Sequence, residues 1–390
     1  MSSVKDIAKK LNKDFNNENL AILADTVPNY ERIPLGSLGA DFPLYGGLPL
    51  GRIIGFSGQE HSGKSLMSAV ALAAYQKRFP DKMSVYVDAE HALDKQFTAL
   101  MTGVDFKKVF YVNPESMSAE DITQMILDFQ SSDDIGMIIL DSIPAMQSAI
   151  NLDTDMGKDN GMRGSIAKTL HRFLGEMADL VSAKNNIFLI INQVRKSTTF
   201  TGAIIYNEPG GDAPKYYRSV GIRCGKRTFI KGDKADCSDG EGADGFRINF
   251  VVTKNKTASV RRGGGFVSFN YETGIDPIRD LLEIALKFEY IKRPTKQKYS
   301  LVDLENGEVY TNEKGEELTF VGKDALISFL NDKNNKAFVE KYFAMLNRAI
   351  VCSNDVSANI LDSEYTKEIK EEEAEVDKNS DTAQKEELRN

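Results

Sequence analysis

The chain has 390 residues, of which 41% are hydrophobic and 27% are charged, so it is long enough to bury one large core and a second, smaller one. This composition excludes a wholly disordered chain and a disulfide scaffold, because only three cysteines are present and none forms a Cys-x-x-Cys pair. The formal net charge of −8 is concentrated in residues 362–390, which hold 11 acidic and 5 basic side chains. The nearly neutral remainder can still carry a basic groove.

The sequence also bears on the compartment. No apolar run reaches the roughly 18 residues needed to cross a bilayer, and the first residues lack the apolar segment of a signal peptide. With its cysteines expected to be reduced thiols, the protein is predicted to be cytoplasmic and to have no membrane partner. The acidic tail, 356–390, is predicted to be disordered, and it either keeps the protein soluble or regulates it.

The first predicted element is a short helix, because Val4, Ile7 and Leu11 repeat at helical spacing. It cannot bury a core alone, so we expect it to dock on the body or on a neighbouring subunit. From residue 53 onward, short apolar strands alternate with longer helices. The predicted strands are 53–56, 84–87, 137–140 and 187–191, and the predicted helices are 66–79, 118–129 and 166–181. Ser118 and Asp121 predict a capping box. This alternation predicts an α/β fold with a mostly parallel, helix-covered sheet.

The pattern changes after about residue 221. Strands then follow closely, including 248–256 and 266–271, and helical periodicity returns at 276–288. Short strands are predicted near Tyr299 and Thr319, followed by two apolar helices up to Val351. We therefore predict a small C-terminal α/β lobe at 276–355.

A phosphate-binding loop is predicted between the first strand and the helix that follows it. The segment reads Gly58, Gln59, Glu60, His61, Ser62, Gly63, Lys64 and Ser65, which satisfies the P-loop pattern in the strand–helix context that the motif requires. Glycines let successive N–H groups turn toward the phosphates, Lys64 would reach the β/γ oxygens, and Ser65 would bind Mg²⁺. The sequence therefore predicts a nucleotide site.

Acidic residues end two of the predicted strands. Asp141 lies where open α/β sheets place their ligands and would orient Mg²⁺ through water, although it could instead share a helix-capping role with Ser142. Strand alternation places Asp88 and Glu90 on one face. Glu90 could polarise a water for attack on a γ-phosphate, or it could cap the next helix.

Five ordered segments resemble bacterial RecA recombinases: 58–65, 88–94, 140–142, 192–195 and 254–256. A further segment, 274–286, resembles the phage UvsX-type branch, and the similarity covers roughly residues 35–350. The resemblance implies a RecA-like P-loop ATPase core at 35–275 and an N-terminal helical oligomerisation segment at 1–34. It implies a DNA-dependent ATPase, with ATP and Mg²⁺ as cofactors, that forms a helical filament on single-stranded DNA and exchanges strands with homologous duplex DNA. Single-strand-binding and loading proteins would be further partners.

The resemblance also implies roles for single residues. Glu90 matches the glutamate that activates water. Asp94 and Phe97 match the residues that contact and stack on adenine, with Phe97 in place of the usual Tyr; Phe97 could equally be a core residue. Gln193 matches the switch between ATP and a DNA-binding loop, although a glutamine at the end of a strand is often simply exposed.

Lys254 and Lys256 lie two residues apart in a predicted strand, so their ammonium groups share one face, ~6 to 7 Å apart. By resemblance, this pair reaches the γ-phosphate held by the adjacent subunit. The alternative is that both lysines protect an exposed edge strand.

Two segments match the DNA-binding loops of the family. The first, 155–164, holds Lys158, Met162 and Arg163, and the second, 195–211, holds Arg195, Lys196, Phe200, Ile204, Ile205, Gly210 and Gly211. Cations combined with a few apolar side chains suit phosphate neutralisation and the separation of stacked bases. Arg163 could instead be a charge on a helix surface.

Two other functions share some of these motifs. One is a RecA-fold motor such as a hexameric helicase or a DNA-packaging ATPase, and the other is a nucleotide-dependent regulatory assembly protein that binds no DNA. The run at 88–94 and the paired lysines favour the recombinase over the motor.

Overall fold

The computed structural model describes residues 3–14, 30–146, 162–198, 204–232, 234–237, 240–258, 263–303, 306–312 and 315–351. The chain divides into two units, 1–31 and 32–390. In the first unit, α1 (Val4–Asp14) confirms the predicted first helix. Ser3 and Asp6 cap it reciprocally, because each side chain accepts a hydrogen bond from the other residue's backbone N–H. Val4, Ile7 and Leu11 remain exposed on its surface.

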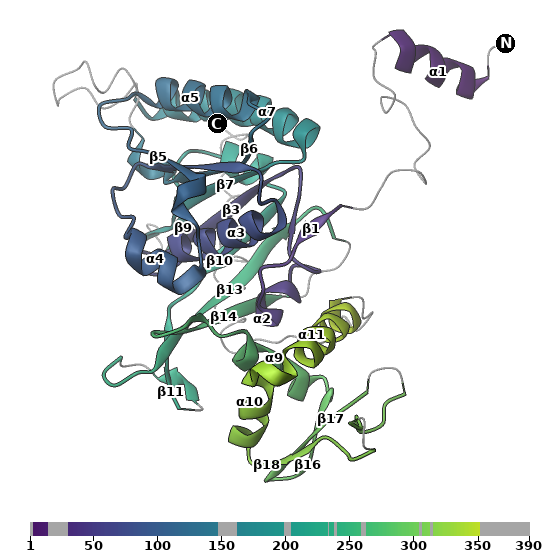
Figure 1. Ribbon diagram of the computed structural model, residues 1–390. Coiled ribbons are helices and arrows are strands. Elements are labelled where there is room, and N and C mark those ends of the chain that lie inside the picture. The colour runs from purple at the N-terminus through teal and green to yellow at the C-terminus, as the bar shows by residue number, and fades with distance from the viewer. Residues whose placement is uncertain are drawn as a thin grey trace. The chain divides into compact units, whose positions relative to one another are not determined.

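An 11-stranded sheet of the described residues forms the centre of the second unit (Figure 1). In neighbour order the strands are β12 (Lys234–Cys237), β11 (Thr228–Lys231), β13 (Gly245–Asn255), β10 (Val220–Cys224), β3 (Arg52–Gly58), β7 (Ile187–Gln193), β6 (Ile135–Asp141), β4 (Met83–Asp88) and β5 (Val109–Val112). Off this path, β14 (Gly264–Asn270) pairs with β13, and β15 (Gly274–Ile275) pairs with β14. The run from β10 to β5 is parallel throughout. The predicted mostly parallel sheet is therefore confirmed.

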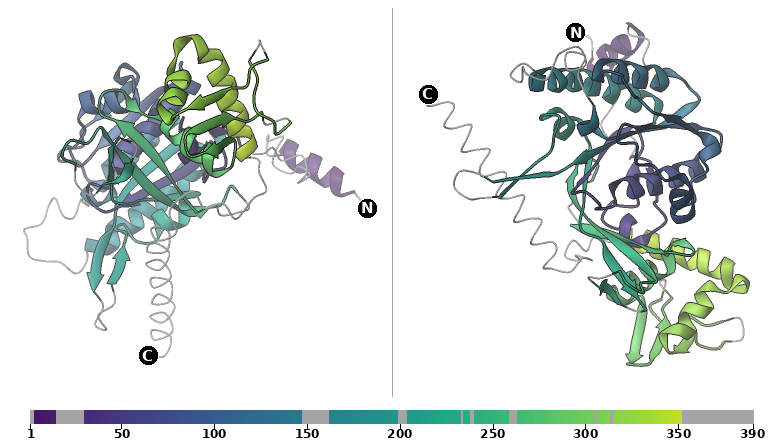
Figure 2. Two further views of the ribbon diagram at one scale, coloured as in Figure 1. Left: turned by 90° about the horizontal axis from the view of Figure 1, so that it is seen from below. Right: turned by 90° about the vertical axis from the view of Figure 1, so that its left-hand side faces the viewer.

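Helices cover both faces of this sheet (Figures 1 and 2). On one face lie α3 (Lys64–Arg78) and α4 (Lys95–Thr102), and on the other lie α5 (Ala119–Ser131) and α7 (Met162–Lys184). In β6, Met137 and Ile139 pack with α3, whereas Ile138 and Leu140 pack with α5 and α7. This alternation explains the unbroken apolar run, because both faces of the strand are buried.

The predicted capping box at the start of α5 is present. Ser118 Oγ accepts from Asp121 N at 3.1 Å, and Asp121 Oδ2 accepts from Ser118 N at 3.3 Å. None of the helices in the described ranges is long and apolar enough to cross a membrane.

The C-terminal helices and strands also follow the prediction. They are α9 (Pro277–Lys287), the antiparallel β16 (Ile291–Thr295), β17 (Lys298–Leu301) and β18 (Thr319–Val321), and then α10 (Lys323–Asn331) and α11 (Lys336–Val351). Their apolar side chains form one cluster that also takes in Phe42, which follows α2 (Leu38–Asp41), and Phe266 of β14. The division of the chain at residues 275 and 276 stays a prediction.

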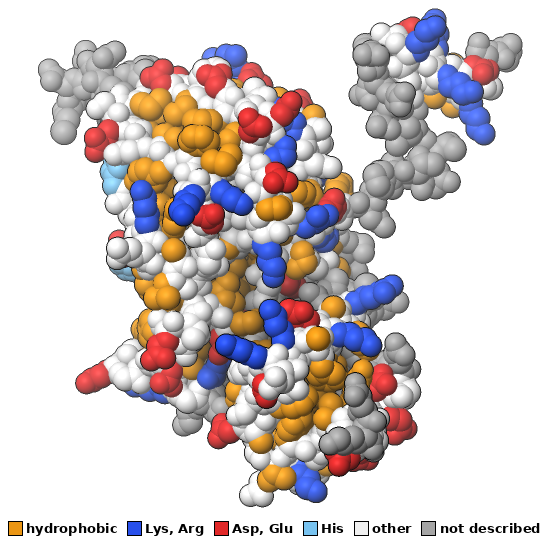
Figure 3. All heavy atoms as spheres, in the orientation of Figure 1, with side chains coloured by type: hydrophobic (Ala, Val, Ile, Leu, Met, Phe, Trp, Pro, Cys, Tyr) orange, Lys and Arg blue, Asp and Glu red, His pale blue; other side chains and the backbone are white. Residues whose placement is uncertain are grey.

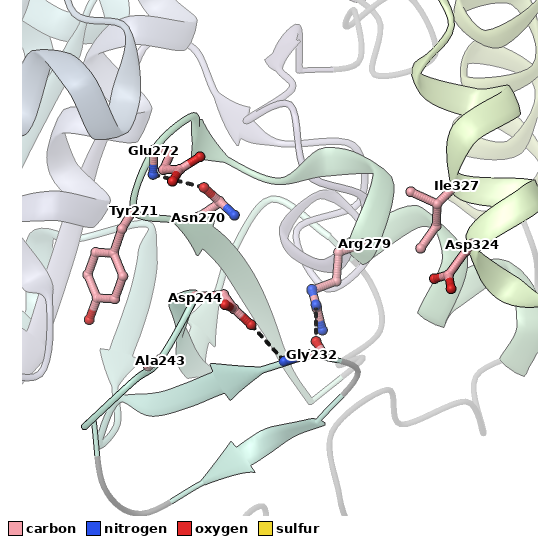
Figure 4. A pocket seen from close by; sticks show the side chains of 9 residues that line it. All are labelled: Gly232, Ala243, Asp244, Asn270, Tyr271, Glu272, Arg279, Asp324 and Ile327. Atoms are coloured by element: carbon pink, nitrogen blue, oxygen red, sulfur yellow. Dashed lines mark hydrogen bonds between the residues drawn. The ribbon is translucent and has the colours of Figure 1, made fainter.

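Polar contacts join α9 to the sheet. Asp280 is fully buried and accepts from Ser37 Oγ and from Ser268 N, and burial raises the pKa of its carboxyl group to about 6. Arg247 of β13 forms a two-armed ion pair with Glu283, at 3.1 and 2.6 Å. Arg279 donates to Gly232 O at the edge of a cavity of about 570 Å³ (Figure 4).

Candidate active site

The predicted P-loop connects the end of β3 to the start of α3. Gly63 is the residue before the helix and has φ 88°, and a Cβ there would lie 2.4 Å from Ile248 Cδ1. This position therefore requires glycine. The Lys64 side chain is buried and donates to Gln59 O at 2.8 Å, and burial lowers the pKa of its ammonium group. The N-terminal end of α3 adds positive potential, because backbone N–H groups point out of a helix at that end.

Asp141 ends β6 and is buried beside the loop. Its Oδ2 accepts from Tyr86 Oη at 2.7 Å, while Oδ1 has no hydrogen-bond partner among the described residues. Burial raises the pKa of Asp141 to about 6, against the opposing effects of the Tyr86 and Ser65 hydroxyls. The next short helix, Ile143–Ala145, has Ser142 as its N-cap, so the capping alternative for Asp141 is wrong.

A buried carboxylate oxygen without a partner, next to a serine hydroxyl, fits Mg²⁺. This ion prefers oxygen ligands and is usually held by few protein groups together with substrate phosphates and waters. Ser65 and Asp141 are the residues that would hold it. Among the described residues, no cluster of three or more His, Cys, Asp or Glu side chains could hold a metal ion.

Glu90 lies where the carboxyl ends of β4, β6 and β7 meet. Its Oε1 accepts from Gln193 Nε2 at 2.8 Å and from Ser142 Oγ. Gln193 in turn pairs with Gly58 at the start of the loop, and Lys64 interacts electrostatically with both Glu90 and Asp141. Five predicted residues, Lys64, Asp141, Glu90, Gln193 and Gly58, are thus brought together.

The loop after β4 is fixed by Asp88. This buried carboxylate accepts from the N–H groups of Ala92 and Leu93 and from Tyr111 Oη. The helix-capping alternative for Glu90 is wrong, because Asp94 caps α4 by accepting from Phe97 N at 3.0 Å. Phe97 is half-buried against the core cluster. The adenine contacts of Asp94 and Phe97 stay a prediction.

The lysine pair lies elsewhere on the sheet. Lys254 of β13 is level with Gly221 of β10 and Gly55 of β3, whereas the P-loop begins at Gly58, level with Phe250. Both ammonium groups point to the end of α8 (Ala213–Tyr217): Lys254 donates to the carbonyls of Lys215 and Tyr216, and Lys256 donates to that of Tyr216. The two groups thus share one face, as expected.

The first DNA-binding segment differs from the prediction. Met162 and Arg163 belong to the first turn of α7, so they are helical rather than part of a loop. The apolar periodicity begins later, at Ile166, which is why the sequence placed the start of the helix too late. Lys158 lies outside the described residues.

The second DNA-binding segment differs as well. Part of it is a hairpin of β8 (Arg195–Thr198) and β9 (Ile204–Asn207), so Arg195, Lys196, Ile204 and Ile205 lie on strands. Phe200 lies outside the described ranges. Gly210 and Gly211 have φ 97° and 74° and form the turn into α8.

Sequence reasoning missed the partners that orient the acidic groups. Ser142 belongs to the segment 140–142 that resembles RecA, but only the fold shows that its hydroxyl donates to Glu90. Tyr86 lies in an apolar strand, and no sequence pattern marks it as the hydrogen-bond partner of Asp141. The ion pair between Glu208 and Arg218 carried no sequence signal, because it depends on space left by two glycines.

Comparison with known proteins identifies the family of this chain. The sequence model of one protein family, the RecA N-terminal domain, matches residues 2–276. The chain belongs to the RecA family. Protein RecA of Chlorobaculum tepidum is 31% identical over 290 residues, which cover 73% of this chain and 78% of that protein. Protein RecA of Clostridioides difficile is 29% identical over 321 residues, covering 80% and 86%, and that of Francisella philomiragia is 29% identical over 299 residues, covering 75% and 78%.

Membership of the RecA family makes the chain a recombination and DNA-repair ATPase. None of these relatives favours the ring-forming motor or the assembly protein that binds no DNA.

Proposed function

We propose that this RecA-family protein hydrolyses ATP in a DNA-dependent manner, within a helical filament on single-stranded DNA that pairs with homologous duplex DNA and exchanges strands. The observation that carries the proposal is the separation of the P-loop from the lysine pair along the sheet. Across the sheet, Lys254 is level with Gly55 and Lys256 is level with Ile53, which are three and five residues before Gly58 in β3. Along the strand, this places the backbone of the two lysines about 10 to 16 Å from the start of the P-loop. One subunit therefore supports only part of an ATPase site.

Glu90 is the proposed general base. Gln193 and Ser142 both donate to its Oε1, which holds the carboxylate in place and leaves Oε2 to accept a proton from the attacking water. Gln193 also adjoins Gly58, and a single residue, Val194, separates it from the β8–β9 hairpin. It is therefore suited to connect the phosphate site with DNA.

Phosphate charge would be met from several sides. Lys64 and the N–H groups at the start of α3 would bind the phosphates, and Ser65 and Asp141 would hold Mg²⁺, which would supply positive charge to offset that of the phosphates. Lys254 and Lys256 of the adjacent subunit would complete the site. We infer that the adenine lies against Asp94 and Phe97.

Self-association is supported by two complementary surfaces. On α1, Val4, Ile7 and Leu11 are exposed among four lysines. On the larger unit, Phe110, Met125 and Phe129 line a cavity of about 550 Å³. Figure 3 shows hydrophobic side chains gathered over α5 and β5 with carboxylates around them. The N-terminal helix of one copy is proposed to pack on this surface of the next copy.

DNA contacts are proposed for the hairpin and its surroundings, namely Arg195, Lys196, Phe200, Ile204, Ile205, Gly210 and Gly211, and for Lys158, Met162 and Arg163 before and within the start of α7. The lysines and arginines would neutralise phosphates, and the apolar side chains would contact bases.

Two measurements on the purified chain test the proposal together. ATP hydrolysis should rise on addition of single-stranded DNA, and electron micrographs with ATP and that DNA should show helical filaments. Closed rings would indicate a ring-forming motor. An ATPase rate indifferent to DNA, with neither filaments nor rings, would contradict the proposed function.

A further inference from the structure

A buried ion pair joins the two ends of the segment between the β8–β9 hairpin and β10. Arg218 Nη1 donates to Glu208 Oε2 at 2.7 Å, and the side chains are only 10% and 4% exposed. Glu208 directly follows β9, and Arg218 directly follows α8. Taking two charges out of water costs free energy, so a buried pair is better explained by what it positions than by the stability it adds.

Two glycines make room for the Arg218 side chain. A Cβ at Gly55 would lie 2.7 Å from Arg218 Cδ, and a Cβ at Gly221 would lie 2.9 Å from Arg218 Nε. Gly55 and Gly221 are paired across β3 and β10, and Gly221 is also paired with Lys254 of β13. The Arg218 side chain therefore lies against β3 and β10 at the level of Lys254.

The short helix α8 is anchored at both ends. Before it, Asn192 Nδ2 donates to Pro209 O at 2.8 Å, and Glu208 is held by Arg218. At its end, the carbonyl of Tyr216 accepts from both Lys254 and Lys256. A helix of five residues has little stability of its own, so these anchors decide where α8 lies.

We propose that Arg218, held by Glu208, is a positioning residue that makes α8 a rigid connection between the base of the β8–β9 hairpin and the Lys254–Lys256 pair. This rests on the proposed function. When this connection is intact, DNA that fixes the position of the hairpin also fixes the position of α8. The carbonyls of Lys215 and Tyr216, which accept from the two lysines, then move with α8. Lys254 and Lys256 would leave these carbonyls to reach the phosphate of a neighbouring subunit. Without it, the hairpin and the lysines move independently, and DNA no longer accelerates hydrolysis.

The charges around Lys254 support this arrangement. Burial, Lys256 and Arg218 together lower the pKa of the Lys254 ammonium group to about 8. Arg218 thus repels the cation that α8 holds, which favours its departure toward an anion. Glu208 partly offsets that repulsion, because it neutralises Arg218.

The activity test compares Arg218→Gln and Glu208→Gln with Arg218→Lys, which keeps the charge. Arg172→Gln is the matched control, since Arg172 forms an exposed ion pair with Glu176 on α7. Both glutamine variants should lose DNA-stimulated turnover by about 10- to 100-fold, the scale expected for a displaced catalytic group. ATP binding and hydrolysis without DNA should be unchanged, Arg218→Lys should recover most of the stimulation, and Arg172→Gln should match the parent protein.

A second readout separates positioning from general loosening. The pH at which Lys254 is half-labelled by an acylating reagent, followed by mass spectrometry, should rise in Arg218→Gln, because a positive neighbour is lost. It should fall in Glu208→Gln, because the charge of Arg218 is then uncompensated. A merely structural role would move both midpoints upward, toward that of an exposed lysine.

Full DNA stimulation in both glutamine variants, or midpoints that move in the same direction, would overturn the proposal. If neither variant folds, Gly55→Ala keeps both charges, and the three heavy atoms nearest to the new Cβ all belong to Arg218. It should lower DNA stimulation by a smaller factor, and unchanged stimulation would overturn the proposal equally. A parent protein without any DNA-stimulated hydrolysis would instead contradict the proposed function itself.

Discussion

Glu90 is the residue that we propose as the general base. Both of its described hydrogen bonds are made to Oε1, from Ser142 and from Gln193, so its orientation is fixed while Oε2 remains available. Glu90→Gln keeps the size and the accepting oxygen but cannot take up a proton. We expect ATP affinity to be retained and hydrolysis to slow by roughly 100-fold or more, measured as single-turnover rates on bound ATP.

The matched comparison for that variant is Lys64→Ala. Lys64 is buried in the P-loop, where it donates to Gln59 O, and we propose that it contacts the phosphates, so its removal should weaken nucleotide binding itself. If Glu90→Gln lost affinity as Lys64→Ala does, and kept a normal rate per bound ATP, Glu90 would be a structural residue.

At the scale of single elements, the sequence revealed most of what depends on apolar periodicity and little of what depends on tertiary contacts. Strands such as β6 and β7 are unbroken apolar runs, and the start of α5 carries its capping residues, so both were predictable. The β8–β9 hairpin was not, because Arg195–Thr198 has no apolar alternation. The five-residue α8 and the contacts of Arg218 depend on neighbouring strands and leave no local pattern.

The docking of α9 gives a prediction with a defined sign. Burial raises the pKa of Asp280 to about 6, so the folded protein binds this proton more tightly than the unfolded chain does. The resulting stabilisation is complete below the ordinary pKa near 4 and is lost as the pH rises through about 6. Relative to Asp280→Asn, the parent protein should therefore lose about 1 kcal/mol of unfolding free energy between about pH 5 and about pH 7.5.

Urea titrations at the two pH values measure this difference. Asp324→Asn serves as the control, because Asp324 is an exposed acid on the neighbouring helix α10. A parent-to-variant difference that does not change with pH would show that Asp280 has the same pKa in the folded and unfolded chains.

At the scale of the whole molecule, the distribution of charge separates the tail from the body. Residues 362–390 carry a net charge of −6, from 5 basic and 11 acidic side chains, so the rest of the chain carries −2 of the total −8. Deleting these residues should give tighter or faster binding to duplex DNA, most clearly at low salt, where charges are least screened. Salt titrations of the full and shortened chains measure this. Indistinguishable affinities would show that the tail acts only on solubility.

Each ATPase site is proposed to be shared between two subunits, and an experiment that mixes two variants tests this sharing. Lys254→Ala/Lys256→Ala should bind nucleotide nearly normally yet lose DNA-stimulated turnover, and Lys64→Ala should be inactive because it lacks the phosphate contact. In a mixture, some interfaces combine the intact P-loop of the first variant with the intact lysines of the second. If the sites are shared between subunits, DNA-stimulated ATPase activity should partly recover in the mixture. No recovery, despite demonstrated co-assembly of the two variants, would contradict it.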